Sequence, residues 1–153
     1  MFKFFKVLFI LTLLCGCSNE SIEDTKEEES MMIVNPIQTY DTLDEINDVV
    51  GTSITLIDSI SDVRYTTVNK EIAQVDFKYQ GYTICLRASF TFEGTELAGT
   101  YGEYEESKID DYTLLNFEFG SVVVYDVNDE HRTLFFKDNL SKDEIKIIID
   151  EIL

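Results

Sequence analysis

The clearest pattern in the sequence is a strict alternation of apolar and polar residues on both sides of Gln80-Gly81. Alternation with period two is typical of β-strands that bury one face. A two-residue turn at Gln80-Gly81 brings all the apolar residues of both strands to one face. The predicted apolar pairs are Tyr79 with Tyr82, Phe77 with Ile84, and Val75 with Leu86. The sequence therefore predicts an antiparallel hairpin with one apolar and one polar face.

Further strands are expected where β-branched and aromatic residues concentrate between turn residues. These segments are residues 54–57, 63–68, 112–119, 122–127 and 131–137. Residues 94–106 interrupt the pattern with three glycines, and we expect a long structured loop there.

A second hairpin is predicted around Gly120-Ser121, because a glycine in the first position suits a type II′ turn. This turn sets Phe119 opposite Val122 and Phe117 opposite Val124. Both aromatic side chains are then expected in the same apolar core as the first hairpin.

A short N-terminal helix is predicted over residues 43–50. Asp41 or Thr42 caps it, and Thr42 and Glu45 have the spacing of a capping box. Gly51 follows the last apolar residue and is a natural helix end.

A second capping box, Ser141 with Glu144, opens a C-terminal amphipathic helix. Its apolar stripe has the i, i+3, i+4, i+7 spacing and consists of Ile145, Ile148, Ile149 and Ile152. The predicted fold class is therefore α+β: a single antiparallel meander sheet of about six strands, with both helices on its apolar face.

Residues 1–16 have the parts of a secretory signal peptide. Lys3 and Lys6 form a positive start, and about ten apolar residues follow, about half of the ~20 needed to span a bilayer. Leu14, Cys15 and Gly16 then precede Cys17, which resembles a bacterial lipoprotein signal (a lipobox).

That resemblance implies cleavage in the Leu14–Gly16 region before Cys17 and lipidation, including palmitate, at Cys17. The alternative is an ordinary secretory signal with an incidental cysteine. Two acyl chains give stable anchoring, where a single chain is marginal. The expected location is the extracytoplasmic side of the cell membrane, with a lipid anchor.

Residues 17–32 carry the lipidated cysteine and an acidic segment without apolar periodicity, which predicts a disordered tether. Like charges extend such a linker. Residues 33–153 are expected to form one α+β domain. The predicted organisation is therefore a signal peptide, a tether and a single domain.

Charge limits the partners. The chain has a net charge of −18. Removing residues 1–16 takes away only Lys3 and Lys6, which leaves 10 basic against 30 acidic residues and a net charge of −20. Such acidity excludes nucleic acid and direct binding to anionic lipid headgroups as expected partners. The remaining partner, a protein or a small ligand, is left open, and contact with the membrane is expected through the lipid alone.

Candidate catalytic groups are few. The single histidine, His131, has no nucleophile indicated near it, so an exposed turn residue is favoured. Asp126–Glu130 alternates oxygen ligands but lacks the glycine and glutamate of an EF-hand loop. Cys85, the only cysteine of the mature chain outside the anchor, permits no internal disulfide. Its reactivity is open, because Arg87 and Asp76 act on its pKa in opposite directions. We expect no enzyme activity, no metal and no cofactor.

The polar face of the first hairpin is the candidate binding face, formed by Gln74, Asp76, Lys78 and Arg87. The two-faced hairpin and the lack of a catalytic set favour a non-enzymatic binding or sensing module. The alternative is a small carrier of apolar ligands, such as lipids, that opens its aromatic core between helix and sheet.

Several short motifs, in order, resemble a domain of unknown function found in exported lipoproteins and membrane-tethered proteins of Gram-positive bacteria, mainly clostridia and relatives. The matching residues are Asn35-Pro36, the run from Tyr40 to Glu45, Gly51, the hairpin from Asn69 to Arg87, Gly94-Thr95-Glu96, Gly99, Tyr101, Tyr104 and Leu140-Ser141. The resemblance covers residues 33–153. This chain departs from it by having no tryptophan and a less glycine-rich turn at residues 128–130.

The family has no established catalytic residues to carry over. The resemblance also implies a distant structural relation to sheets that handle lipids in the periplasm and to sheets that regulate sigma factors. The resemblance therefore implies a binding or sensing role.

Overall fold

The computed structural model describes residues 35–153, which belong to one compact unit, Val34–Leu153. The predictions for Leu14, Gly16, Cys17 and the tether lie outside the described residues. Within residues 35–153, no helix is long and apolar enough to cross a membrane.

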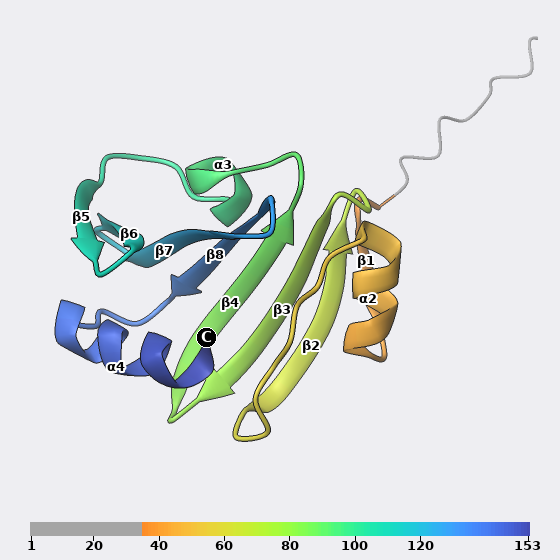
Figure 1. Ribbon diagram of the computed structural model, residues 1–153, viewed down its shortest axis with the longest axis horizontal. Coiled ribbons are helices and arrows are strands. Elements are labelled where there is room, and N and C mark those ends of the chain that lie inside the picture. The colour runs from red at the N-terminus through yellow and green to blue at the C-terminus, as the bar shows by residue number, and fades with distance from the viewer. Residues whose placement is uncertain (1–34) are drawn as a thin grey trace, which may run out of the picture. The chain divides into compact units, whose positions relative to one another are not determined.

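Eight antiparallel strands form one sheet in the order β1-β2-β3-β4-β8-β7-β6-β5 (Figure 1). The strands are β1 Ile37–Tyr40, β2 Ser61–Val68, β3 Ile72–Tyr79, β4 Tyr82–Ser89, β5 Glu105–Ile109, β6 Tyr112–Phe117, β7 Gly120–Val127 and β8 Glu130–Phe136. The α+β class with a mostly antiparallel sheet is confirmed, but the prediction of about six strands in a single meander is wrong. Two four-stranded meanders join instead where β8 pairs with β4.

The two additional strands, β1 and β5, lie at the sheet edges. β1 pairs only with β2, and β5 pairs only with β6. β5 has the sequence EESKI and is mostly exposed, so it shows little apolar alternation. Edge strands are often short and charged, which removes the pattern that identifies a strand.

The expected strand at residues 54–57 is also wrong, because this segment lies beside the sheet without pairing to it. Side chains hold it instead. Asn47 Nδ2 donates to the Ile54 carbonyl at 2.9 Å, and the Ser53 amide donates to Glu130 Oε2 at 2.8 Å. The β-branched residues of this segment fit a buried irregular segment as well as a strand.

The β3–β4 hairpin is confirmed with its predicted register. Tyr79 pairs with Tyr82, and the polar face pairs Asp76 with Cys85 and Gln74 with Arg87. Gln80 and Gly81 both have positive φ, 49° and 91°, which is the conformation of a type I′ turn.

The β6–β7 hairpin has a different turn from the predicted one. Phe117 pairs with Gly120, so the chain turns at Glu118-Phe119, and Phe119 is exposed. Gly120 is the first residue of β7 and not a turn residue. The predicted pairings of Phe119 with Val122 and of Phe117 with Val124 are therefore wrong; Val124 pairs with Thr113.

Both predicted helices are confirmed with their capping boxes: α2 (Leu43–Val50) at Thr42 and α4 (Lys142–Ile152) at Ser141. They pack on one face of the sheet, here called the inner face. Ile46 of α2 and the Ile145, Ile148 and Ile149 side chains of α4 belong to one core cluster with the apolar side chains of β3, β4, β7 and β8.

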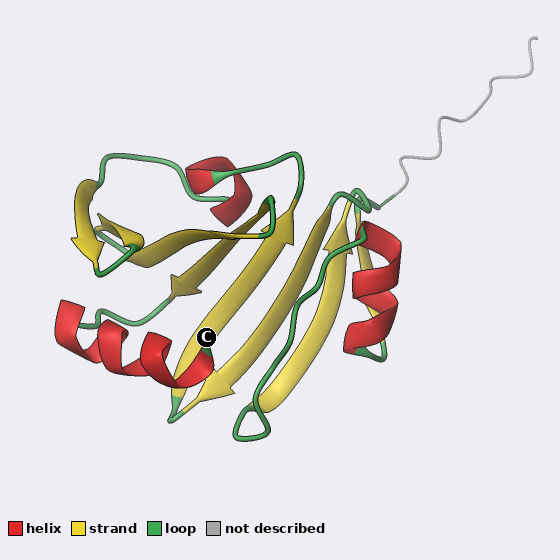
Figure 2. Ribbon diagram, viewed as in Figure 1, coloured by secondary structure: helices red, strands yellow, loops and turns green. Residues whose placement is uncertain are grey.

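The third helix, α3 (Gly94–Ala98), packs on the opposite side, here called the outer face, against β4, β7 and β8 (Figure 2). A second apolar cluster lies beneath it. It contains Ala98, Leu115, Phe117 and Val122, with Val124 and Phe135 packed against them. The prediction of a wholly polar second face is therefore wrong: the outer face is polar along β3 and β4 and apolar along β6, β7 and β8.

Candidate binding cleft on the outer face

A cleft of about 460 Å³ lies on the outer face, between the polar strands and the segment that follows α3. Its polar residues come from β2, β3, β4 and the end of β8: Arg64, Gln74, Asp76, Arg87 and Lys137. Its aromatic residues come from the α3–β5 connection, the β6–β7 turn and β8: Tyr101, Phe119 and Phe135.

The structure brings three of the four residues of the predicted binding face into this cleft: Gln74, Asp76 and Arg87. Lys78 does not line it, and its Nζ lies 2.8 Å from Asp62 Oδ2. Arg64 and Lys137 were missed by sequence reasoning. Identifying them requires the pairing of β2 with β3 and of β8 with β4, and the second of these joins segments distant in sequence.

Among residues 35–153, Asp76 is the only acidic residue that lines the cleft, and basic groups lie close to it. Arg64 Nη2 and Gln74 Nε2 each donate to Asp76 Oδ2 at 2.8 Å, and Lys137 Nζ lies 4.0 Å from Oδ1. Burial raises the pKa of Asp76, but the hydrogen bonds from Arg64 and Gln74 outweigh it, so the pKa lies below the ordinary 3.8. Asp76 therefore stays ionised at neutral pH.

This geometry predicts how Asp76 titrates. Its lowered pKa contributes stability that is present above pH 3.8 and is lost as the pH falls through the folded-state value. Arg64→Ala removes the largest lowering contribution and is expected to move the pKa of Asp76 upward. Carboxyl chemical shifts followed by NMR during an acid titration measure it. Lys142→Ala, a change to a basic residue outside the cleft, should leave the pKa unchanged; an equal shift in both variants would contradict the assignment.

Arg87 connects the sheet to the segment above it. Its Nε donates to Gln74 Oε1 at 2.9 Å, and its Nη1 donates to the Leu97 carbonyl at 3.1 Å. A Cβ at Gly99 would lie 2.3 Å from Arg87 Nη1. The absence of a side chain at Gly99 thus lets the chain pass close to the guanidinium. Arg87 in turn holds the segment after α3, which lines the cleft, through its hydrogen bond to the Leu97 carbonyl.

Aromatic rings continue from the cleft across the outer face. Phe119 contacts Phe135 with a centroid separation of 6.3 Å and stacks on Phe117 at 5.4 Å, and Tyr104 lies 5.3 Å from Phe117. Phe119 is about half exposed and Tyr101 is 82% exposed. The cleft therefore has a basic side and an exposed aromatic side.

Cys85 lies at the floor of the cleft and is buried. Burial, with the negative charge of Asp76, raises the pKa of the thiol to about 12. The sequence alone left the reactivity of Cys85 open, because Arg87 lowers the pKa of the thiol and Asp76 raises it. Burial, which raises this pKa, is the largest effect in the structure. A thiol with this pKa is uncharged at neutral pH and is a poor nucleophile.

The acidic turn after β7, at Asn128-Asp129, does not arrange its side chains around a common metal-binding point in the described part of the chain. His131 Nδ1 lies 2.8 Å from Asp126 Oδ1, and Glu130 is buried beneath the turn. Among residues 35–153, no group of three His, Cys, Asp or Glu side chains is placed to hold a metal ion.

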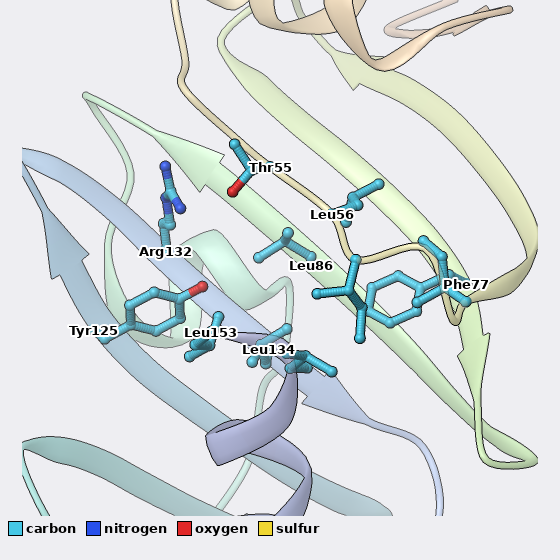
Figure 3. Close-up of a pocket in the computed structure, with 11 residues that line it drawn as sticks. Thr55, Leu56, Phe77, Leu86, Tyr125, Arg132, Leu134 and Leu153 are labelled. Carbon is cyan, nitrogen blue, oxygen red and sulfur yellow. The ribbon is translucent and has the colours of Figure 1, made fainter.

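A second, smaller cavity lies on the inner face among residues 55–60, α4 and the sheet (Figure 3). Figure 3 shows Leu86, Leu134 and Leu153 lining it, with Tyr125 and Arg132 at one end. Its volume is about 40 Å³. This space is close to that of one water molecule.

Searches of protein-family models, curated proteins and solved structures give no match to this chain. The resemblance to the domain of Gram-positive lipoproteins stays a prediction.

Proposed function

We propose that the protein is a lipid-anchored, non-enzymatic binding or sensing module on the extracytoplasmic side of the membrane, and that it binds its partner in the outer cleft. The observation that carries the proposal is the combination of exposed aromatic rings with three basic residues around Asp76 in one cleft. Solvent-exposed aromatic side chains beside convergent polar groups are common features of binding sites.

The electrostatics of the cleft support the same proposal. Residues 35–153 contain nine basic residues, and three of them line this one cleft, in a chain with a net charge of −18. Three basic residues and one described carboxylate, Asp76, line the cleft beside aromatic rings. The cleft therefore has a net positive lining in a strongly acidic protein.

The binding proposal is tested by charge reversal at Lys137, whose side chain is half exposed and makes no hydrogen bond among the described residues. We expect Lys137→Glu to remove at least one partner recovered by cross-linking on intact cells of the host. Lys142→Glu is the matched control, because it changes the net charge equally at an exposed position outside the cleft. Identical sets of cross-linked partners for both variants and the wild type would show that the cleft is not the binding site.

The anchor is tested separately at Cys17. Replacing Cys17 with alanine should stop palmitate labelling and release the protein from membranes, since the acyl chains supply the membrane affinity. Cys15→Ala should leave labelling intact. Palmitate labelling of the Cys17→Ala protein would overturn the lipoprotein proposal.

The alternative proposal is a carrier of apolar ligands in the core between α4 and the sheet. The aromatic and aliphatic lining of the inner cavity favours it, but a space of about 40 Å³ holds no acyl chain unless α4 moves. Native mass spectrometry of protein purified from its own host decides between the two. A bound lipid mass in addition to the covalent anchor would support the carrier, and its absence would support the binding module.

A further inference from the structure

We infer that the ligand of the outer cleft carries a single carboxylate next to an aromatic or bulky apolar group. The inference rests on the proposed function of this cleft and adds the chemistry of the ligand. It follows from three properties of the described residues: a guanidinium without an anionic partner, an ammonium in the same cleft that is only distantly paired with Asp76, and an exposed aromatic surface.

Arg87 is the first of these. It is partly buried, and among residues 35–153 no carboxylate lies within ion-pair distance of it. Its side chain donates hydrogen bonds through Nε and Nη1, both to neutral oxygens, and Nη2 has no partner among the described residues. A partly buried cation is stabilised by an anion, so the cleft offers one anion-binding position at Arg87.

Lys137 is the second. Its Nζ lies 4.0 Å from Asp76 Oδ1, beyond hydrogen-bond distance, while Asp76 Oδ2 already accepts from Arg64 and Gln74. Asp76 is thus held mainly by Arg64, and Lys137 Nζ makes no hydrogen bond among the described residues. Lys137 and Arg87 line the same cleft, so the positive charges of both attract a carboxylate bound there.

The charge of the ligand follows from its surroundings. Asp76 and the strongly acidic protein repel any anion, and a dianion doubles this repulsion as well as the attraction to the cations of the cleft. Among the described cations of the cleft, Arg64 and Lys137 both lie within ion-pair distance of Asp76, whereas Arg87 has no carboxylate near it. One carboxylate on the ligand therefore completes the ion pairing of the cleft.

The aromatic side supplies the rest of the affinity. Phe119 and Tyr101 keep much of their surface in solvent although both border the cleft. An exposed apolar surface beside a charged group favours a ligand that combines both features. The predicted ligand class is therefore an aromatic or branched apolar carboxylate.

The test uses the full-length protein in detergent, with a detergent blank, and N-acetyl-phenylalanine as the probe in calorimetric titrations. Its neutral analogue is N-acetyl-phenylalaninamide, which differs only in the charged group. We expect the acid to bind about fivefold more tightly than the amide, the scale of one exposed ion pair. Lys137→Gln should reduce this preference, because it removes one of the two charges that attract the carboxylate, whereas Lys142→Gln should preserve it. Phe119→Ala should weaken both probes.

The outcomes separate this inference from the proposed function. If acid and amide bind equally and Phe119→Ala weakens both, the inference that the ligand carries a carboxylate is wrong, and the cleft is still a binding site. If phenyl phosphate binds more tightly than the acid, the inference that the ligand carries a single negative charge is wrong. Binding of neither probe, while Lys137→Glu still loses its cross-linked partner on cells, would overturn the ligand class alone. Lys137→Glu with an unchanged set of partners would overturn the proposed function itself.

Discussion

Glu130→Ala is expected to lower the free energy of unfolding by about 3–5 kcal/mol, because it leaves a buried arginine without its counter-charge. The Glu130 and Arg132 side chains are 2% and 9% exposed, and Arg132 Nε lies 2.5 Å from Glu130 Oε1. Glu130 Oε2 also accepts hydrogen bonds from the amide and hydroxyl of Ser53. The substitution therefore breaks the ion pair and releases the segment that covers the inner core.

Chemical denaturation of the variant and the wild type measures this loss. Glu103→Ala is the control, since Glu103 is exposed, and its effect should stay within about 0.5 kcal/mol. The double variant Glu130→Met/Arg132→Met should recover much of the loss, because replacing both charges removes the unpaired one. A loss below about 1 kcal/mol for Glu130→Ala would show that the pair is not a determinant of stability.

Glu130 also shows where sequence reasoning reached its limit. Asp126 and Asp129, its neighbours, are exposed, as expected for an acidic turn. Nothing in the local sequence distinguishes Glu130 from these two exposed residues. Burial comes from residues 52–60, which cross over the start of β8 and are fixed there by Ser53. A contact between residues 77 positions apart leaves no local signal.

The parts that were predictable are local. The β3–β4 register follows from alternation on both sides of one turn, and both helices follow from a capping box next to an apolar stripe. In each case, residues close in sequence carry all the information. The pairing of β4 with β8 instead joins two meanders across an insertion containing α3, and it determines both the strand order and the place of Lys137.

The outer apolar cluster was missed for a related reason. In β6, the adjacent residues Leu114 and Leu115 are both apolar and both buried, one on each face of the sheet. A strand that is apolar on both faces loses the alternation that identifies a face. The sequence suggested one core, whereas α3 completes a second one beside the cleft.

Gly120→Ala is expected to lower the free energy of unfolding by about 3–5 kcal/mol, because two costs of about 1–3 kcal/mol each add at this position. Gly120 has a φ of 147°, which L-residues rarely adopt. A Cβ there would lie 2.4 Å from the Phe136 carbonyl oxygen and 2.8 Å from Phe135 Cε2. The first neighbour is backbone within the β7–β8 pairing, so relief of the contact requires movement of the strands.

Gly81→Ala separates the two costs. Gly81 also has a positive φ, 91°, but nothing lies within 4 Å of its Cβ position, so its loss should be about 1–2 kcal/mol. Denaturation of both variants gives the difference, and equal losses would show that the contact with Phe136 is relaxed without cost. Phe119 precedes Gly120 in the chain, the Phe135 ring lies against the Gly120 Cβ position, and both rings line the cleft. Gly120→Ala should therefore also weaken binding of N-acetyl-phenylalanine, and Gly81→Ala should not. The close contact between Gly120 and the end of β8 thus also holds Phe119 and Phe135, which form the aromatic side of the cleft.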